Sequence, residues 1–401
     1  MHDVVIVGGG PGGLHAARVL AQSGFDAVVF EEHPTSGDPV HCTGVLATDA
    51  FAEFQLPRET ILNELSTARF VAPSGASISY TTTAVEAVAI DRLVFDRRLS
   101  ESAVKEGATV VAGVRVASVD PDTQGVRTVL TTGETIRSRA CVLACGASYR
   151  LQQRLGMGLP RLFLQSAQME LPLDRTPAGD VEVHVGRGIA PDGFAWIVPV
   201  RRGAAWHARI GLMCERRAAA HFRSFAALVQ ARLGLALGDV GALRPRCKML
   251  PLAPIGRTYA GPVLAIGDAA GIVKATTGGG IYYSLLSAGL AARVLASALR
   301  RGTVDAGTLS GYERAWRARL GPEIDTQLEL RELAHRMSDA DIEALFELAR
   351  TDGIMPIVRR TARFNQHRAL IRAVFRHPPA RRLLFDRLRG RDGRQLHALS
   401  S

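Results

Sequence analysis

The sequence predicts an α/β fold: a doubly wound domain, interrupted by a mostly antiparallel sheet domain and followed by a helical C-terminal region. Two glycine-rich segments support this prediction, because GGGPGG follows an apolar stretch at the N-terminus and GDAAG, with TTGGGI after it, begins at residue 267. Between them, strand-like segments follow one another with short turns, as in antiparallel sheets. We therefore expect the two glycine-rich pieces to share one domain and the chain between them to form a second.

The first elements form a βαβ unit. Val4–Gly8 is an apolar strand, the apolar residues of Gly12–Ser23 have helical spacing, and Ala27–Glu31 is a second strand. The N-terminus lacks a basic region and a cleavage site, so we interpret it as the first strand and not as a signal peptide.

The turn inside this unit has the spacing of a dinucleotide-binding site. In its GxGxxG pattern, Gly8 allows a tight turn, Gly10 lets the backbone approach a pyrophosphate, and Gly13 lets the helix pack closely on the strand. Glu31 ends the second strand about 20 residues on, where a carboxylate binds ribose hydroxyls. A glycine-rich turn without a ligand is the alternative interpretation.

Alternation and turn residues place the next elements. Pro34–Gly44 is a loop, and Ala68–Thr83 alternates like a hairpin that turns at PSG. Arg92–Glu106 has the pattern of a helix, whereas Thr109–Val119 and Ala140–Ala144 have that of strands.

The middle section has the pattern of an antiparallel sheet. Strand-like segments at 163–171, 181–185, 194–200 and 205–213 precede a helix at 218–235. We predict a cofactor domain, a substrate-binding sheet domain and a helical region, with the bounds 1–67, 91–155 and 245–302 for the first, 68–90 and 156–244 for the second, and 303–401 for the third.

The second glycine-rich segment distinguishes FAD from NAD. A buried strand, Val263–Ile266, leads to Asp268, which is placed to accept a hydrogen bond from a ribityl hydroxyl. The N–H groups around Gly280 and Ile281 can face the flavin pyrimidine edge, where negative charge develops on reduction. A plain NAD domain has no use for this element, so we predict FAD. The alternative for Asp268 is a turn or helix cap.

The rest of the chain is helical and basic. Helices are expected from near Gly278 to about residue 300, at 309–337 and at 339–350, before an arginine-rich tail. The net charge is +11, and the segment from residue 353 to 401 contributes twelve arginines against two acids. Such a tail allows an anionic membrane, an acidic substrate or a nucleic acid as partner.

A peripheral membrane contact is the interpretation that the tail favours. Its apolar residues recur at helical spacing, which predicts an amphipathic basic helix in the headgroup region; they are Ile371, Val374, Phe375, Leu383, Leu384 and Leu388. No base-reading motif or aromatic interleaving indicates a nucleic acid. The alternative is an arginine-rich helix packed on the protein.

The composition is that of a globular protein, with 47% apolar and 22% charged residues in 401. The most apolar run is too short for a membrane span and carries Arg293. Five scattered cysteines indicate reduced thiols and a cytoplasmic location; they are Cys42, Cys141, Cys145, Cys214 and Cys247.

Several motifs are missing from the sequence. No second GxGxxG precedes a helix, so NADPH or NADH, as electron donor, would visit the flavin only transiently. Position 47, five after Cys42, is alanine, which excludes the disulfide-reductase pair CxxxxC. No cluster such as HExxH indicates a metal.

Together these motifs resemble one family. GGGPGG, Glu31, CTG at Cys42–Gly44, DRLVFD at Asp91–Asp96, FAWIVP at Phe194–Pro199 and GDAAG with TGGGI are similar to the geranylgeranyl reductases. That family belongs to the para-hydroxybenzoate-hydroxylase-like flavoproteins, and the resemblance covers about residues 1–300. It implies a Rossmann-like FAD-binding domain with an inserted sheet domain.

The resemblance also implies roles for individual residues. Gly12 and Glu31 would contact the pyrophosphate and ribose of FAD, Arg92 its phosphate or adenosine side, and the Val116 backbone its adenine. The residues expected beside the isoalloxazine are Cys42, Thr43 and Gly44, and those at the ribityl and pyrimidine end are Asp268, Gly280 and Ile281. The alternatives are a solvated arginine at position 92 and an ordinary buried thiol at position 42.

The substrate wall is implied by the strand that contains Phe194, Trp196 and Pro199. Trp196 offers a flat apolar surface to an isoprenoid chain, although an aromatic residue on a sheet is more often plain core. The family pattern has tyrosine, phenylalanine and lysine where this chain has Phe194, Val198 and Val200, which argues against a phosphorylated head group. At residues 144–146 this chain has Ala-Cys-Gly, whereas related hydroxylases have an Asp-Gly pair there. The missing carboxylate argues against a hydroxylase.

The resemblance implies an FAD-dependent reductase that saturates C=C bonds of a hydrophobic isoprenoid-type substrate. Cys42 is the candidate proton donor, since it is the ionisable side chain that the motif places near the flavin. One alternative is a flavin monooxygenase, a hydroxylase or epoxidase acting on an aromatic or polyketide-like substrate. The other is a non-catalytic flavoprotein or a basic surface-binding module.

Overall fold

The computed structural model describes residues 1–174, 176–177, 181–235, 237–351 and 353–388, and it confirms the predicted α/β class. Its central sheet has eight strands, and five of them are parallel neighbours. The strand order is β17 (Tyr259–Ala260), β18 (Val263–Ala265), β11 (Thr135–Leu143), β1 (His2–Val7), β2 (Ala27–Glu31) and β8 (Thr109–Ala112). An antiparallel extension of β11 consists of β10 (Gly125–Leu130) and β9 (Val116–Asp122).

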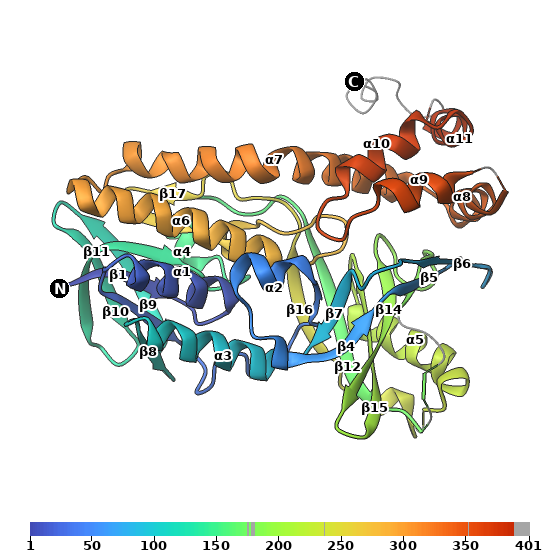
Figure 1. Ribbon diagram of the computed structural model, residues 1–401, viewed down its shortest axis with the longest axis horizontal. Helices are drawn as coiled ribbons and strands as arrows, with labels where there is room; N and C mark the ends of the chain where they lie inside the picture. Colours follow the sequence, from blue (N-terminus) through green and yellow to red (C-terminus); the bar gives the residue numbers. More distant parts are fainter. Residues whose placement is uncertain (175, 178–180, 236, 352, 389–401) are drawn as a thin grey trace.

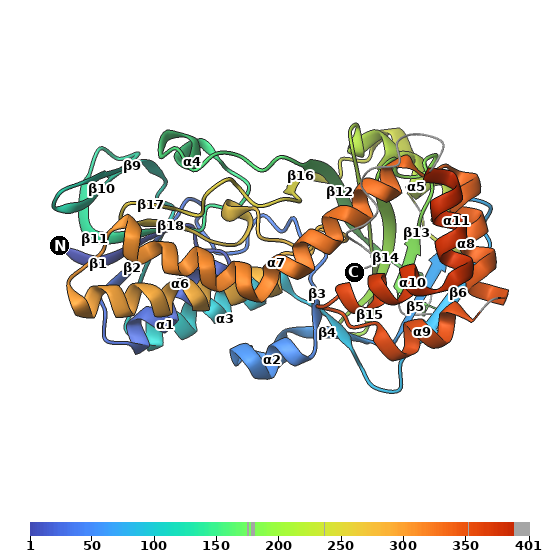
Figure 2. The same cartoon turned by 90° about the horizontal axis from the view of Figure 1, so that it is seen from above.

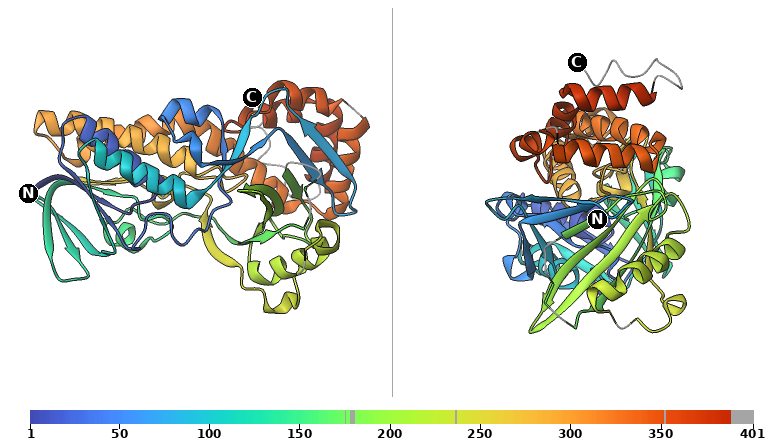
Figure 3. Two further views of the ribbon diagram at one scale, coloured as in Figure 1. Left: turned by 60° about the horizontal axis from the view of Figure 1, so that its bottom comes forward. Right: turned by 90° about the vertical axis from the view of Figure 1, so that its right-hand side faces the viewer.

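Helices cover one side of this sheet. They are α1 (Pro11–Gln22), α3 (Arg92–Lys105) and α6 (Ile281–Arg301), and Figure 3 shows them together above the strands. The central strand β1 is fully buried from Val4 to Ile6, because helices and strands cover both of its faces. The predicted strand at 109–119 is two strands, β8 and β9, since Gly113 adopts a φ of +75° and turns the chain between them.

The second sheet has seven strands, and all of its neighbouring strands are antiparallel except β13 and β5. Their order is β16 (Arg246–Pro251), β12 (Phe163–Pro172), β15 (Ala205–Cys214), β14 (Phe194–Arg202), β13 (Val181–His184), β5 (Thr67–Val71) and β6 (Ser77–Thr81). The helix α5 (Ala218–Leu233) packs on one face through Phe222 and Phe225. The segment β16 was assigned to the cofactor domain from sequence, but it pairs with β12 along six residues.

A third, small sheet was not predicted. Its strands β3 (Val45–Ala47), β7 (Ala87–Ile90) and β4 (Ile61–Leu65) are three to five residues long, too short to show an alternating pattern. Two short α-helices, α2 (Asp49–Phe54) and α4 (Arg150–Arg154), and three 3-10 helices complete the described elements before residue 306; the 3-10 helices are Arg58–Thr60, Val240–Ala242 and Gly267–Ala270.

The C-terminal helices connect both sheets. Figure 2 shows α7 (Ala306–Arg336) running along α6 and on toward the second sheet. There it is followed by a group of four helices that lies over that sheet in Figure 1. The four are α8 (Asp339–Thr351), α9 (Ile354–Thr361), α10 (Arg368–Arg376) and α11 (Pro378–Leu388).

The apolar face predicted for membrane contact is used inside the protein. Ile371, Phe375 and Leu384 are 5–6% exposed and form a small core with Leu333 of α7. Val374 and Leu383 are half-buried, and the side chain of Leu388 lies outside the described part. For Ile371, Phe375 and Leu384 the amphipathic spacing therefore reflects packing between α7, α10 and α11. Among the described side chains of this segment, several arginines are exposed.

One described helix is long and apolar enough to cross a membrane by length and composition alone. This helix is α6, of which 72% of the most apolar window is buried inside the protein. It is the core helix beneath α7, where Tyr312 and Trp316 are fully buried.

Candidate functional site

A cavity of about 1000 Å³ lies where the two sheets and the C-terminal helices meet. Its wall combines glycine-rich segments, the cavity face of the second sheet and residues of α7 to α10. It therefore joins the predicted cofactor site and the predicted substrate wall in one continuous space.

The nucleotide end is built on the carboxyl ends of parallel strands. Gly8 follows β1 with a φ of +107°, and a Cβ there would lie 2.4 Å from the carbonyl oxygen of Ala144, the residue after β11. The backbone N–H of Ala144 donates to Val7 over 2.8 Å, and that of Ile266 donates to Leu143 over 3.0 Å. Three strands thus end at one edge, where such folds bind their ligands.

Two helix N-termini open into the cavity. The N-cap of α1 is Gly10 and that of α6 is Gly280, and neither helix has a side-chain cap. A Cβ on Gly10 would meet no atom within 4 Å, so the backbone there is open to a ligand. Uncapped helix N-termini attract anions through their free N–H groups and dipole.

Glu31 is engaged with its own surroundings. Its Oε2 accepts a hydrogen bond from the backbone N–H of Gly9 over 2.6 Å, and its Oε1 accepts one from the N–H of His33 over 2.9 Å. Glu31, Gly8 and Val116 lie outside the lining of the main cavity. Their predicted roles at the adenosine end remain predictions.

Asp268 lies at the opposite end of the predicted flavin site. It follows β18 in a short 3-10 turn, and its Oδ2 is 3.6 Å from the Nζ of Lys248 on β16. Its Oδ1 would lie 2.7 Å from a Cβ on Gly280. Asp268, Gly280 and Ile281 all line the cavity, as the ribityl and pyrimidine roles require.

The CTG turn is fixed between the two sheets. Gly44 has a φ of +71°, and its N–H donates to the Sγ of Cys42 over 3.3 Å. Thr43 Oγ1 donates to Gln168 over 2.9 Å, and its carbonyl accepts from Arg209 over 2.6 Å. All three residues of the turn line the cavity.

Arg209 holds this turn, a role that no sequence motif indicated. It is 4% exposed and also donates to the carbonyl of Ile90 over 2.8 Å and to Glu170 over 2.9 Å. Although burial opposes it, hydrogen bonds from Arg202 and Arg209 lower the pKa of Glu170 to about 2. Glu170 is therefore ionised at neutral pH and anchors both arginines.

Arg92 lines the cavity at the start of α3, but its guanidinium is already paired. It donates to both carboxylate oxygens of Asp96, over 3.2 and 2.8 Å. Burial opposes its charged form, whereas Asp96 and the neighbouring Cys42 sulfur raise the pKa of Arg92. Arg92 is thus an ionised and ion-paired residue whose side chain is only 13% exposed, and the alternative of a solvated arginine is wrong.

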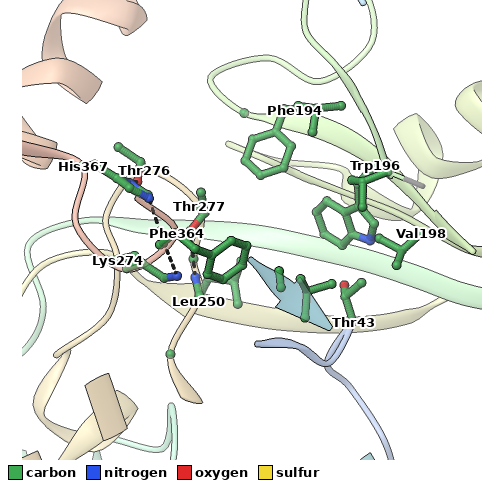
Figure 4. Close-up of a pocket in the computed structure, with 18 of the residues that line it drawn as sticks. Thr43, Phe194, Trp196, Val198, Leu250, Lys274, Thr276, Thr277, Phe364 and His367 are labelled. Carbon is green, nitrogen blue, oxygen red and sulfur yellow. Dashed lines mark hydrogen bonds between the residues drawn. The ribbon is translucent and has the colours of Figure 1, made fainter. Parts of the chain in front are cut away.

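The substrate wall follows the alternation of β14. Phe194, Trp196 and Val198 point from one face into the cavity, where Figure 4 shows them in a row. Pro199 is on the other face and lies outside the lining, because successive side chains of a strand point to opposite sides. The prediction that Pro199 contacts the substrate is therefore wrong. Pro199 belongs to the sheet, and its carbonyl oxygen accepts a hydrogen bond from Nδ2 of Asn63 over 3.0 Å.

Three further residues line the cavity and were missed from sequence. Lys274 belongs to the loop before α6, and Phe364 and His367 come from the segment between α9 and α10. Lys274 is 4% exposed, and burial lowers its pKa to about 7. Burial and the nearby Lys274 lower the pKa of His367 to about 4. The C-terminal helices thus complete the cavity, which the resemblance over residues 1–300 did not indicate.

The residues present fit FAD. The open backbone at Gly10 suits a pyrophosphate, and the uncapped N-terminus of α6 suits the pyrimidine edge of a flavin. The described residues contain no group of three or more histidines, cysteines, aspartates or glutamates that could hold a metal ion.

Comparison with known proteins agrees with this geometry. A family model described as pyridine nucleotide-disulphide oxidoreductase matches residues 2–168, the segment that carries the glycine-rich turn. The redox-active cysteine pair of such reductases has no counterpart at position 47, which is alanine. The match therefore concerns nucleotide binding.

Curated relatives cover most of the chain. Digeranylgeranylglycerophospholipid reductase of Methanocaldococcus jannaschii is 27% identical over 361 residues, covering 86% of this chain and 90% of its own. The enzyme of the same name from Methanoculleus marisnigri is 28% identical over 363 residues, covering 86% and 89%.

Solved structures share the fold. A geranylgeranyl bacteriochlorophyll reductase-like protein from Thermoplasma acidophilum superposes with a TM-score of 0.81 at 22% identity, over 96% of this chain and 99% of its own. PqsL of Pseudomonas aeruginosa, in complex with 2-aminobenzoylacetate, gives a TM-score of 0.67 at 18% identity, over 86% and 99%.

Proposed function

We propose that this chain, which belongs to the geranylgeranyl reductase family of FAD-dependent oxidoreductases, reduces C=C bonds of an isoprenoid lipid. One observation carries the proposal: a single cavity connects the two uncapped helix N-termini with the apolar face of β14. A cofactor held at the helix ends would thus lie beside an apolar chain on the sheet. The two curated relatives named above are lipid reductases, and they align with this chain over 90% and 89% of their own length. This similarity supports the same substrate class.

The protein's own residues would position both partners and exclude water. Bound FAD would supply the hydride. Backbone N–H groups at the start of α1 would bind its pyrophosphate, and those at the start of α6 would stabilise the negative charge of the reduced state. Phe194 and Trp196 would hold the apolar chain and keep the site dry.

The second alkene carbon requires a proton. Cys42 lines the cavity beside Arg92, and its Sγ already accepts from the N–H of Gly44. We propose that this thiol delivers the proton from Sγ. Among the described residues, His41 and Lys248 also line the cavity and are the alternative proton donors.

The electron donor is NADPH or NADH in this proposal, acting without a domain of its own. The substrate is proposed to come from a membrane, since a lipid with isoprenoid chains dissolves there. The protein would act in the cytoplasm and touch the anionic surface through exposed arginines of α9 and α11, such as Arg359, Arg360 and Arg382.

Anaerobic half-reactions test the proposal. The flavin of the holoenzyme is reduced with NADPH, NADH or dithionite. A panel of polyprenyl lipids with and without a phosphorylated head group is then added, each with its saturated counterpart as control. We expect reoxidation by the unsaturated lipid alone, with saturated product detected by mass spectrometry. Reoxidation only by oxygen, accelerated by an aromatic substrate, would instead indicate the monooxygenase. A flavin that no donor reduces would indicate a non-catalytic flavoprotein.

A further inference from the structure

The segment between α9 and α10 returns from the C-terminal helices into the cavity. Its residue Phe364 lines the cavity and packs against the buried cluster that includes Val198 and Val200 of β14, and Trp196 packs against the same cluster. Figure 4 shows the Phe364 ring between Lys274 and the strand that carries Phe194 and Trp196. An apolar chain lying on β14 would therefore meet Phe364 on its other side.

Lys274 holds this segment at its tip. Its Nζ donates to the carbonyl oxygen of Phe364 over 3.1 Å and to Oδ1 of Asn365 over 3.3 Å. The same nitrogen lies 4.1 Å from the centroid of the Phe364 ring, within the range of a cation–π contact. One side chain thus fixes both the backbone and the ring of Phe364.

Further contacts fix the segment on either side of the tip. Thr276 Oγ1 and His367 Nδ1 are 2.7 Å apart, and Asn365 Nδ2 donates to Asp49 over 3.1 Å. The hydroxyl of Tyr283 on α6 donates to the carbonyl of Asn365 over 3.4 Å. The anchoring residues come from the loop before α6, from α6 itself and from α2.

The anchor is continuous with the predicted flavin site. The backbone N–H of Lys274 donates to the carbonyl of Gly279 over 3.2 Å, and a Cβ on Gly279 would lie 2.8 Å from the Lys274 Cε. Gly280, the next residue, is the N-cap of α6. The loop that presents α6 to the flavin therefore also sets the position of Phe364.

A buried ammonium group is costly unless its surroundings compensate. Lys274 is 4% exposed, and the charged or titratable groups that face it are Asp49 from α2 and His367 from the anchored segment. Burial lowers the pKa of Lys274. The two carbonyl-type acceptors and the ring of Phe364 compensate for part of this cost.

We propose that Phe364 contacts the substrate chain opposite Trp196 and determines which of its double bonds reaches the flavin, and that Lys274 is the positioning residue for Phe364. The inference rests on the proposed function, because it concerns which double bond of the bound isoprenoid chain lies at the flavin; we call this alignment the register of the isoprenoid chain. An isoprenoid chain carries a methyl branch and a double bond at regular intervals, so a rigid ring can select one register among several. A smaller side chain at position 364 would leave more space, and the isoprenoid chain could then bind in neighbouring registers.

The product pattern of partly reduced lipid tests the role of Phe364. Holoenzymes of wild type, Phe364→Leu and Phe364→Ala are compared on the digeranylgeranyl lipid, phosphorylated or not, that wild type reduces fastest, and mass spectrometry locates the reduced bonds after limited turnover. We expect a defined order of reduction in wild type and a mixed order in both variants. The control is Phe25→Leu, because Phe25 lies outside the cavity and stacks with Arg300. An unchanged order in both Phe364 variants would overturn the inference while the proposed function stands.

The role of Lys274 is tested by a conservative pair of variants. Lys274→Met removes the ammonium group, and Lys274→Arg keeps a cation with several N–H donors. We expect the first to show the mixed order of Phe364→Ala with FAD still bound, and the second to restore part of the wild-type order. A wild-type order in Lys274→Met would overturn the positioning role.

A binding measurement separates this inference from the proposed function. The saturated C20 alcohol phytanol is titrated into each oxidised holoenzyme, and the flavin absorbance change gives its Kd. We expect the Kd to rise about tenfold in Phe364→Ala, which corresponds to about 1.4 kcal/mol, and to stay unchanged in Phe25→Leu. If wild type reduces no polyprenyl lipid, the proposed function fails, and an unchanged Kd in Phe364→Ala would then overturn the inference as well.

Discussion

The backbone N–H of Gly9 donates a hydrogen bond to Oε2 of Glu31 over 2.6 Å, which joins the glycine-rich turn directly to the carboxyl end of β2. The Glu31 carboxylate would also accept hydrogen bonds from the ribose hydroxyls of FAD. Replacing Glu31 by Gln removes the negative charge of this acceptor. A hydrogen bond to a charged group contributes about 1.5–3 kcal/mol, so FAD affinity is expected to fall by about one to two decades. Equilibrium dialysis of the flavin measures this loss.

Glu32→Gln is the matched control for Glu31→Gln. The neighbouring carboxylate is exposed and lies 3.6 Å from Arg115. We expect flavin affinity and the thermal midpoint of this control to equal those of wild type. Equal flavin retention in both variants would show that Glu31 does not hold the ribose.

The bound cofactor is expected to be non-covalent FAD. The two uncapped helix N-termini suit its phosphates and its flavin edge, and no residue of the motifs demands a covalent bond. The purified protein should be yellow, and acid precipitation should release FAD into the supernatant, where chromatography identifies it. Recovery of NAD, or of no nucleotide, would contradict the assignment.

Cys42→Ala is expected to leave FAD bound but to slow turnover. The Cys42 side chain lines the cavity between the predicted flavin and the substrate, and alanine cannot donate a proton there. Cys42→Ser should be milder, since its hydroxyl can still donate. Cys145→Ala serves as control, because that thiol bonds Gln152 and Ser148 outside the cavity lining. Full activity in both Cys42 variants would leave Cys42 a packing residue.

Acid is expected to destabilise the fold through His15. Burial and the adjacent Arg18 and Arg293 lower the pKa of His15 from 6.5 to about 3. Below pH 6.5 the unfolded chain binds a proton at this ring and the folded protein does not. The contribution of His15 is therefore fully present above pH 6.5 and is lost as the pH falls toward 3.

Thermal midpoints between pH 7 and pH 5 measure this effect. We expect them to fall less steeply in His15→Gln than in wild type, because glutamine has no such proton to bind. His221→Gln on α5, a half-buried histidine, should keep the wild-type slope. Identical slopes in all three proteins would rule out His15 as the acid-sensitive group.

Membrane contact through the tail is tested by charge, since three of its apolar residues, Ile371, Phe375 and Leu384, are buried. Arg359, Arg360 and Arg382 are exposed, and each basic residue near an anionic bilayer contributes about 1 kcal/mol. Replacing all three by glutamine should reduce co-sedimentation with anionic vesicles by about a hundredfold. Wild type should bind anionic but not neutral vesicles, and high salt should release it.

The control for the vesicle experiment replaces three exposed arginines elsewhere, Arg97, Arg150 and Arg161. We expect this variant to bind like wild type. If both triple variants lose binding equally, the attraction comes from net charge and not from the tail. Wild type that stays in the supernatant with every vesicle would reject membrane contact.

The sequence was most informative where a local pattern is sufficient for the structure. GxGxxG needs only one turn between a strand and a helix, so β1, α1 and β2 were predicted closely. The fold class and the family followed from such motifs, and both are confirmed. The small sheet of β3, β7 and β4 was missed because strands of three to five residues give too short a pattern.

The site was less predictable, because its walls come from distant parts of the chain. Arg209 and Thr43 are 166 positions apart, and Lys274 and Phe364 are separated by 90. No motif links such pairs. Pro199 was misplaced for a different reason: its motif was taken as a unit, although the alternation of β14 turns Pro199 away from Trp196. Membrane contact of the tail stays a prediction, because an amphipathic pattern does not reveal whether its partner is a bilayer or α7, and Ile371, Phe375 and Leu384 pack on Leu333 of α7.

The residues of the cavity wall come from the N-terminal, middle and C-terminal parts of the chain. This arrangement has a consequence for biosynthesis. The first glycine-rich turn leaves the ribosome early, but α6 follows only after residue 281 and the closing residue Phe364 after most of the chain. Domains generally fold as units during synthesis, N-terminal first, whereas this cofactor pocket is still incomplete when the second sheet has been made. A flavin that binds at both helix N-termini would therefore find its site complete only after α6 has been made, and the cavity face of β14 would be covered later still, by α7 to α10.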